Sequence, residues 1–183
     1  RINSGTQQQW ISRNSAWGTW AGSSWNMVFV GVDNPPPASW PEPAYTVVEK
    51  TPVSREKPYL FIDDKGDYGV LVPDLAAKES QGISWSKGPT PGRVLPIGQF
   101  YIARPDQDNA ASLNAALQGG KNLIFTPGLY DLEASLHVTR PDTVVLGLGY
   151  ATLMPTRGTP ALVVADVDGV KIGGLLFESG PVN

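Results

Sequence analysis

Residues 122–179 consist of short runs of strand-forming apolar residues, each ended by glycine, proline or aspartate, with no helical pattern between them. The predicted strands are residues 123–126, 130–132, 136–139, 143–147, 152–154, 162–165, 170–172 and 175–178. Equivalent positions recur after 21–26 residues in three interleaved series: Leu123, Val144 and Val170; Leu136 and Leu162; and Tyr130, Thr152 and Leu175. Three series with one period indicate three strands per coil, each stacked on its equivalent in the next coil. The sequence therefore predicts an all-β fold, a right-handed parallel β-helix.

The glycines between these strands fit the bends of such a coil. They are Gly147, Gly149, Gly169, Gly173 and Gly174, and glycine tolerates the positive φ angles and close backbone contacts of a bend. A sandwich of antiparallel hairpins is the alternative fold. That fold would favour Asn-Gly turns between strands, and no Asn-Gly pair occurs after residue 122.

One segment, DQDNAASLNAALQGG at residues 106–120, has the pattern of a helix. Asp108 or Asn109 is a suitable N-cap, and Gly119 suits a left-handed stop. The residues predicted to share one apolar face are Ala110, Leu113, Ala116 and Leu117. A helix this short is marginal alone, so we expect its apolar face to cover the open end of the first coil.

The two ends of the chain suggest a piece of a longer protein. The sequence begins at RINSGTQQQW, without an initiator methionine, and it ends at ESGPVN, with no pattern that predicts a cap for the last coil. Because solenoids need terminal caps, we expect the coil to continue in a downstream segment or a second chain.

The region before the helix is irregular and β-rich. Tryptophans are frequent in residues 1–32, which end in the predicted strand WNMVFVGV. The following DNPPPASWPEPAY is predicted to be a surface connection, because closely spaced prolines remove backbone donors. KPYLFIDDKGDYGVLVPDL then predicts a hairpin that turns at Lys65 and Gly66.

Composition excludes several classes of function. The net charge is -3, with 14 Lys and Arg against 17 Asp and Glu, which gives no basic surface for nucleic acid. No apolar run is long enough to cross a membrane. The chain has no cysteine, which excludes disulfides, zinc–thiolate sites and a cysteine nucleophile. Few charges together with many glycines, prolines and aromatic residues are typical of secreted bacterial β-proteins, so we expect an extracellular location.

The segment DNAASLNAALQGGKNLIFTPGLYDLEASLHVTRPDTVVLGLG resembles the start of a pectate-lyase-like β-helix, with a capping helix, a strand and a TPGLY turn. This domain recurs in glycoside hydrolase family 55, the exo-β-1,3-glucanases of two tandem β-helices, and in actinobacterial secreted proteins with coagulation factor 5/8 type domains. Upstream, WNMVFVGV followed by SREKPYL is similar to the family passage that leaves the first β-helix. The resemblance thus implies three parts: residues 1–52, the end of a preceding β-helix region; residues 53–104, a connector with a hairpin; and residues 105–183, the capping helix and first coils.

The resemblance implies a secreted, inverting glycosidase that acts on a β-glucan in the cleft between two helices. Inversion needs a carboxylic acid for the leaving oxygen and a separate means of activating water. In the family the acid lies far along the second helix, so the general acid is expected outside this chain. The family positions water with a Gln-x-Gln pair, and Gln7 and Gln9 match that arrangement and would point the same way from a strand. No metal or other cofactor is predicted.

Other residues have both a functional and a structural interpretation. The indole rings of Trp10, Trp17, Trp20 and Trp25 could stack on substrate sugars, or they could pack in the interior. The run Arg55, Glu56 and Lys57 could form an ion-paired clasp between the two halves or contact a ligand. DDKGD and ADVDG have the carboxylate spacing of calcium loops but lack the later bidentate glutamate, so turns explain both. His137 is expected to face outward from a coil.

Two alternatives to a glucanase remain open. One is a catalytically silent β-helix that binds polysaccharide or serves as a scaffold, as in a tailspike or an adhesin. The other is a polysaccharide lyase, which would require a calcium cluster and a catalytic arginine or lysine on the coils. No such cluster can be identified in the sequence.

Overall fold

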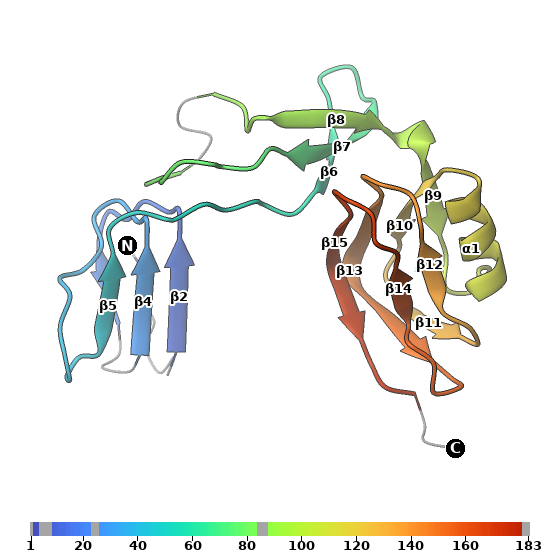
Figure 1. The fold of residues 1–183 in the computed structure, drawn as a ribbon. Coiled ribbons are helices and arrows are strands. Elements are labelled where there is room, and N and C mark those ends of the chain that lie inside the picture. The colour runs from blue at the N-terminus through green and yellow to red at the C-terminus, as the bar shows by residue number, and fades with distance from the viewer. Residues whose placement is uncertain (1, 4–8, 23–25, 84–87, 181–183) are drawn as a thin grey trace. The chain divides into compact units, whose positions relative to one another are not determined.

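The computed structural model of the chain describes residues 2–3, 9–22, 26–83 and 88–180 (Figure 1). The chain forms two compact units. Unit 1 comprises Arg1–Glu56 and Pro73–Pro91, and unit 2 comprises Lys57–Val72 and Gly92–Asn183. After its first 56 residues, therefore, the chain enters unit 2, returns to unit 1 for one segment, and then completes unit 2.

Unit 2 contains a parallel β-helix (Figure 1). Its strands are β9 (Phe100–Ala103), β10 (Asn122–Phe125), β11 (Leu129–Leu132), β12 (Leu136–Val138), β13 (Val144–Pro155), β14 (Leu162–Val164) and β15 (Lys171–Phe177). They stack in three columns: β9, β10 and the first parts of β13 and β15; β11 and the later parts of β13 and β15; and β12 with β14. Every pair is parallel, so the predicted parallel β-helix with three strands per coil is confirmed.

The register within these columns agrees with the predicted series at one face and differs at the others. Leu136 pairs with Leu162, as predicted. Leu123, however, pairs with Val145 and not with Val144. In the remaining series, Tyr130 pairs with Leu153, and Thr152 pairs with Leu176. The predicted series therefore named the correct neighbouring strands but placed two of the columns one residue out of register.

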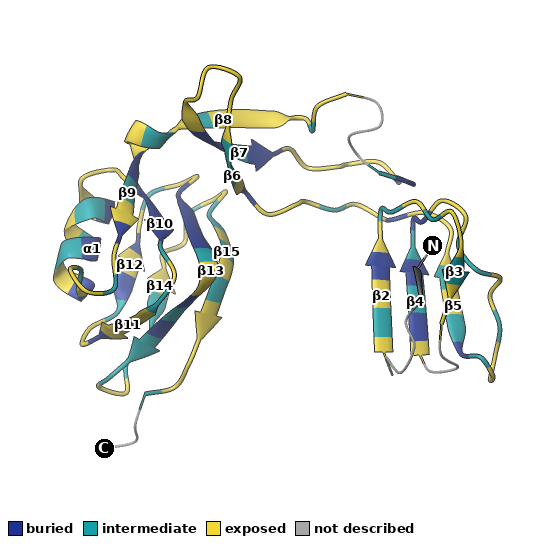
Figure 2. Cartoon of the chain, turned by 180° about the vertical axis from the view of Figure 1, so that it is seen from behind, coloured by how far each residue is buried: buried dark blue, intermediate teal, exposed yellow. Residues whose placement is uncertain are grey.

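The error has a physical cause, because the first column is buried on both faces. Leu123 and Val145 face the interior of the coil, whereas Ile124 and Val144 belong to a second apolar cluster on the other side. All four residues of β10 are buried, as Figure 2 shows. Apolar side chains thus occupy consecutive positions, and the alternation that would fix the register is lost.

The second cluster is covered by the predicted hairpin. Strands β6 (Tyr59–Ile62) and β7 (Tyr68–Pro73) are antiparallel, and β8 (Gly92–Pro96) lies beside β7. One carboxylate oxygen of Asp63 accepts hydrogen bonds from the amides of Lys65 and Asp67, both at 2.9 Å. The DDKGD motif is therefore a hairpin turn. Val70 and Val72 of β7 pack against the β-helix in this cluster.

Helix α1 (Ala110–Gln118) closes the apolar interior of the coil, as predicted. Asn109 is the N-cap, and it forms a capping box with Ser112. Leu113 and Leu117 are buried in the same cluster as the interior residues of the strands. The predicted left-handed stop at Gly119 was wrong: Gly119 has φ -73°, and Gly120 has φ +80°. The Gly119 amide still donates to Ala115, which keeps that residue near helical geometry.

Asp108 links this helix to strand β9 by three hydrogen bonds. It accepts from the Tyr101 hydroxyl at 2.5 Å, from the Arg104 amide at 2.8 Å and from the Ser112 hydroxyl at 2.9 Å. Burial opposes ionisation of this carboxylate, but the hydrogen bonds from Tyr101, Arg104 and Ser112 outweigh it and lower the pKa of Asp108.

Replacing Asp108 with asparagine is expected to lower the free energy of unfolding by about 1–2 kcal/mol at neutral pH, because a charge-assisted network is lost. Because the pKa of Asp108 is lowered in the folded protein, its stabilising effect is complete above the ordinary aspartate pKa of about 4. This effect is lost as pH falls through the pKa of Asp108 in the folded protein. Urea titrations followed by circular dichroism should therefore show the two proteins converging below pH 4. Asp106→Asn, at an exposed carboxylate nearby, is the control. A gap that persists unchanged at pH 2 would contradict the assignment.

Unit 1 is also built on parallel strands. Strands β2 (Gln9–Arg13), β4 (Asn26–Val30) and β5 (Tyr45–Val48) form one sheet, and β1 (Ile2–Asn3) pairs with β3 (Trp20–Ala21). Trp10 lies opposite Met27, which lies opposite Tyr45. Met27, Phe29 and Val32 form the buried core of this unit. The sheet therefore repeats a parallel, stacked arrangement with a shorter period than the coils of unit 2.

Candidate functional site

The predicted glutamine pair is described only in part. Gln7 lies outside the described residues. Gln9 is the first residue of β2, it is exposed, and it pairs in register with Asn26 of β4. The water-positioning role of the two side chains therefore stays a prediction.

Three of the four selected tryptophans form an aromatic cluster on the core of unit 1, and Trp25 lies outside the described residues. The centroids of the Trp10 and Trp20 rings are 5.1 Å apart, and those of Trp17 and Trp20 are 5.9 Å apart. Trp20 also makes an edge contact with Phe29 at 5.1 Å. All three indoles are half-buried. Packing accounts for their positions, and a contact with sugar stays a prediction for the edges that remain accessible.

Unit 1 contains a pocket of about 580 Å³. Its lining residues are Asn14, Asp33, Ser54, Glu56, Pro73, Asp74, Leu75, Ala76, Glu79, Ser80, Gln81, Gly82, Ile83, Thr90 and Pro91. Asn14 directly follows β2, and Asp33 lies shortly after β4. The pocket is therefore at the carboxyl ends of the parallel strands of unit 1.

The other wall of the pocket comes from the described residues 73–83 and 88–91, here named the return segment, which leaves β7 and docks on unit 1 before β8 begins. The backbones of Thr51 and Ser80 exchange hydrogen bonds of 2.8 and 3.0 Å, and those of Ser54 and Ala76 exchange bonds of 3.1 and 2.8 Å. The side-chain amide of Asn14 donates to the Ser80 hydroxyl at 2.9 Å. These bonds fix the return segment in the manner of an added antiparallel strand.

Two glycines allow the return segment to approach closely. Gly31 has φ +57°, and a Cβ atom there would lie 2.3 Å from the Thr51 hydroxyl and 2.7 Å from the Ser80 carbonyl oxygen. A Cβ atom on Gly82, at φ +73°, would lie 2.2 Å from a carboxylate oxygen of Asp33. Side chains at these positions would displace the segment, so the shape of the pocket depends on both glycines.

The charged groups of the pocket are all acidic: Asp33, Glu56, Asp74 and Glu79. Glu56 forms an ion pair of 2.6 Å with Arg13, and Glu79 lies 3.7 Å from Lys50. The run at Arg55, Glu56 and Lys57 was predicted to be a clasp or a ligand contact, and Glu56 makes its ion pair within unit 1. The other three carboxylates were missed, because the return segment brings together residues that are far apart in the sequence.

One further aromatic residue is exposed in unit 1 and was not selected from the sequence. Trp40 is 77% exposed, in the proline-rich connection between β4 and β5. The Ser39 and Tyr45 backbones exchange two hydrogen bonds at the base of this connection. The ring of Trp40 is therefore exposed, whereas the rings of Trp10, Trp17 and Trp20 are packed.

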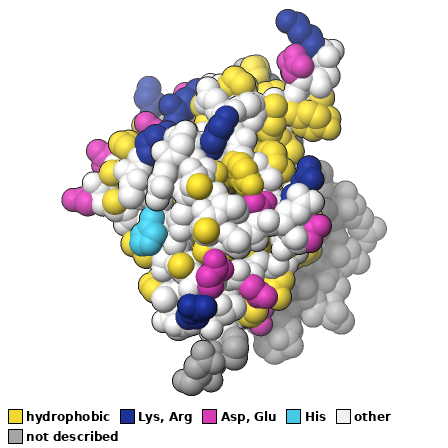
Figure 3. Space-filling view, turned by 90° about the vertical axis from the view of Figure 1, so that its right-hand side faces the viewer, with side chains coloured by type: hydrophobic (Ala, Val, Ile, Leu, Met, Phe, Trp, Pro, Cys, Tyr) yellow, Lys and Arg dark blue, Asp and Glu magenta, His cyan; other side chains and the backbone are white. Residues whose placement is uncertain are grey.

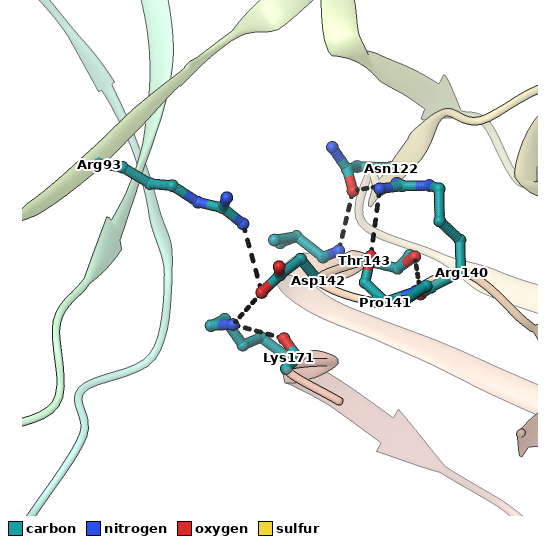
Figure 4. Close-up of polar contacts among 9 residues, drawn as sticks. Arg93, Asn122, Arg140, Pro141, Asp142, Thr143 and Lys171 are labelled. Atoms are coloured by element: carbon teal, nitrogen blue, oxygen red, sulfur yellow. Dashed lines mark hydrogen bonds and ion pairs between the residues drawn. The ribbon is translucent and has the colours of Figure 1, made fainter. Parts of the chain in front are cut away.

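Unit 2 has a polar network at the bend between β12 and β13, where Figure 4 shows two cations converging on one carboxylate. An oxygen of Asp142 lies 3.6 Å from Arg93 of β8 and 3.5 Å from Lys171 of β15. The side-chain oxygen of Asn122 accepts from the Val144 amide at 2.9 Å and from Arg140 at 3.0 Å. The Asp142 amide donates to the Asp168 carbonyl oxygen, so the ADVDG motif belongs to a coil turn.

The remaining sequence candidates have structural explanations. The one histidine, His137, is exposed, as predicted, and is visible at the surface in Figure 3. Its backbone amide donates to Asn114 of α1 at 2.8 Å. Within the described part of the chain, no group of three His, Cys, Asp or Glu residues is placed to hold a metal ion. Among the same residues, no helix is long and apolar enough to cross a lipid bilayer.

Comparisons with known proteins relate both units to one enzyme type. Residues 100–183 match the family model of the LAM55 pectate lyase-like domain. Over 178 residues, 97% of the chain, the sequence is 48% identical to an exo-beta-1,3-glucanase of Streptomyces sp. (strain SirexAA-E / ActE). The fold is similar to the structure of sacteLam55A from Streptomyces sp. SirexAA-E, with TM-score 0.87 and 44% identity. A variant of sacteLam55A in complex with glucose gives TM-score 0.90 and 48% identity.

These relatives are much longer than the chain. The two structural matches each cover 98% of this chain but only 34% and 32% of the solved chains. The chain spans 29% of the length of the Streptomyces glucanase. The matches confirm the resemblance to pectate-lyase-like β-helix proteins of the glycoside hydrolase family 55 type, with residues 100–183 similar to the LAM55 pectate lyase-like domain.

Proposed function

We propose that this chain is part of a secreted glycoside hydrolase that acts on β-1,3-glucan. The observation that carries the proposal is the 48% identity to an exo-beta-1,3-glucanase over 97% of the chain. Because that identity extends across unit 1 and unit 2, it supports a shared activity as well as a shared fold. A polysaccharide is the substrate, and further coils outside this chain complete the enzyme.

The proposed chemistry is hydrolysis with inversion. A carboxylic acid outside this chain protonates the leaving oxygen, and water attacks from the opposite face of the sugar. Gln7 and Gln9 are two positions apart, so on one strand their side chains project from the same face. Two amides held in this way can orient the attacking water by hydrogen bonds, which lowers the entropy cost of the attack.

The double substitution Gln7→Ala and Gln9→Ala tests this role in the native protein that carries the chain. Release of glucose from laminarin is expected to fall by about 100-fold or more, because the attacking water is no longer oriented. Gln118→Ala, at the exposed last residue of α1, is the matched control and is expected to leave the rate unchanged.

Two results would count against the proposal in different ways. An unchanged rate in the double variant would remove the glutamines from the mechanism and leave the glucanase activity standing. Failure of the unmodified native protein to release glucose from laminarin, in spite of binding it, would overturn the glucanase assignment.

A further inference from the structure

We propose that the pocket of unit 1 binds a neutral sugar unit of the glucan and selects against acidic polysaccharides. The identity of the glucan rests on the proposed function. The location and the selection against acidic polysaccharides rest on the residues of the pocket. The inference therefore adds to the glucanase activity a second site on the chain that binds the polysaccharide.

The size and the mixed lining of the pocket suit a sugar. Its volume of about 580 Å³ is within the range of about 300–1,000 Å³ typical of small-molecule sites. Apolar surface comes from Pro73, Leu75 and Pro91, and Leu75 is 49% exposed. A pyranose ring has apolar C–H faces and a polar rim of hydroxyls, so it can contact both kinds of surface at once.

The charges of the pocket decide which polysaccharide fits. Four carboxylates line it, and no lysine or arginine is among the described lining residues. Ionised carboxylates accept strong hydrogen bonds from sugar hydroxyls. A phosphate, sulfate or uronate group would instead meet like charge, which costs free energy at short range. The pocket therefore disfavours acidic ligands, and a neutral, hydroxyl-rich sugar follows from the glucan of the proposed function.

Two of the four carboxylates form no ion pair within the described residues and can therefore accept hydrogen bonds from a ligand. Glu56 is paired with Arg13, and Glu79 lies near Lys50. Within the described residues, no ion pair involves Asp33 or Asp74. A metal ion is not favoured as the ligand, because the described residues contain no group of three metal-binding side chains. Asp33 and Asp74 are thus the expected acceptors for sugar hydroxyls.

Strand β2 connects Gln9, the described member of the predicted glutamine pair, with the pocket. Gln9 begins β2, which is five residues long, and Asn14 of the pocket directly follows its end. At about 3.3 Å per residue, the two are about 16 Å apart. A sugar in the pocket is therefore a different unit of the polysaccharide from one at Gln9, which suits a polymer held at more than one point.

Ala76→Trp tests the site by filling the pocket. Ala76 lines the pocket and is exposed, so an indole there occupies the cavity without entering the core. Ala77→Trp is the matched control, since Ala77 is exposed but does not line the pocket. Isothermal titration with a neutral β-1,3-gluco-oligosaccharide is expected to show affinity at least about tenfold weaker for Ala76→Trp, and unchanged affinity for Ala77→Trp.

A second variant tests whether the carboxylates of the pocket select against acidic ligands. This test does not depend on how the indole packs. Asp74→Asn combined with Glu79→Gln removes two negative charges without changing the volume of the pocket. It is expected to increase the affinity for an oligogalacturonate, which the unmodified chain should bind at least about tenfold more weakly than the neutral oligosaccharide. Circular dichroism checks that each variant is folded.

The outcomes separate this inference from the proposed function. Equal binding of the neutral oligosaccharide by the unmodified chain and the folded Ala76→Trp variant would overturn the pocket site, whatever the rate of glucose release. Equal binding of neutral and acidic oligosaccharides by the unmodified chain would overturn the selectivity. Failure of glucose release with intact, Ala76-dependent binding would overturn the glucanase assignment and support the pocket.

Discussion

Replacing Gly147 with alanine is expected to destabilise unit 2 by about 3 kcal/mol, at the upper end of the usual cost of overpacking. Gly147 lies at the bend in β13, where the register against β15 shifts. A Cβ atom there would lie 2.2 Å from the carbonyl oxygen of Gly174 and 2.7 Å from a methyl group of Leu175. The opposing atom is backbone, so neither coil can relieve the clash by a change of rotamer.

Hydrogen exchange of the β13 and β15 amides measures this effect, because exchange protection reports the local free energy of opening. Tryptophan fluorescence is unsuited to it, since the described tryptophans, Trp10, Trp17, Trp20 and Trp40, belong to unit 1. Gly98→Ala is the matched control within unit 2: Gly98 is exposed, and a Cβ atom there would have no neighbour within 4 Å. Similar protection in the Gly147 and Gly98 variants would show that the two coils do not approach closely at this bend.

Replacing Tyr130 with alanine is expected to destabilise unit 2 by about 3–5 kcal/mol, as is typical when a buried aromatic ring is removed. Tyr130 is 1% exposed, and its ring meets that of Phe125 edge-on at 4.9 Å. The carbonyl oxygens of Ala103 and Thr126 lie 2.9 and 3.0 Å from its hydroxyl and share its one proton. Burial raises the pKa of Tyr130, so the hydroxyl stays protonated and able to donate at neutral pH.

Tyr130→Phe separates the two contributions, since it keeps the ring and removes the hydroxyl. It is expected to cost about 1–2 kcal/mol, because buried carbonyl groups lose a donor. Tyr150→Phe, at a ring that is 83% exposed, is the control and should change stability by less than about 0.5 kcal/mol. Urea unfolding followed by circular dichroism provides the comparison. Equal stability of the Tyr130→Phe and Tyr150→Phe variants would contradict the role of the buried hydroxyl.

Much of unit 2 was predictable because its signals are local. The capping residue Asn109, the apolar face with Leu113 and Leu117, and the turn at Asp63 each depend on residues within about one turn of one another. The pairing of Leu136 with Leu162 was also found from the sequence, since β12 alternates between buried and exposed residues. In β12 this alternation marks which residues face the interior of the coil.

The candidate site was much less predictable. The glutamine pair was selected from the family resemblance and the tryptophans by residue type, but Trp10, Trp17 and Trp20 are packed against one another. The pocket depends on the return segment, whose contacts join residues such as Asn14 and Ser80 across 66 positions. Nothing local in the sequence marks these residues as neighbours, because each lies in an ordinary polar loop.

The sequence by itself determined the parallel β-helix and its three strands per coil, because strand patterns recur along the chain, and it determined the capping helix, because helix end signals are local. Only the tertiary structure decided the register of the columns that contain Leu123 and Tyr130. Strand β10 is buried on both faces, and the register of β13 against β15 shifts between Leu146 and Ala151. The tertiary structure also decided the pocket of unit 1, because a chain that returns to an earlier unit forms contacts whose energies depend on the assembled backbone.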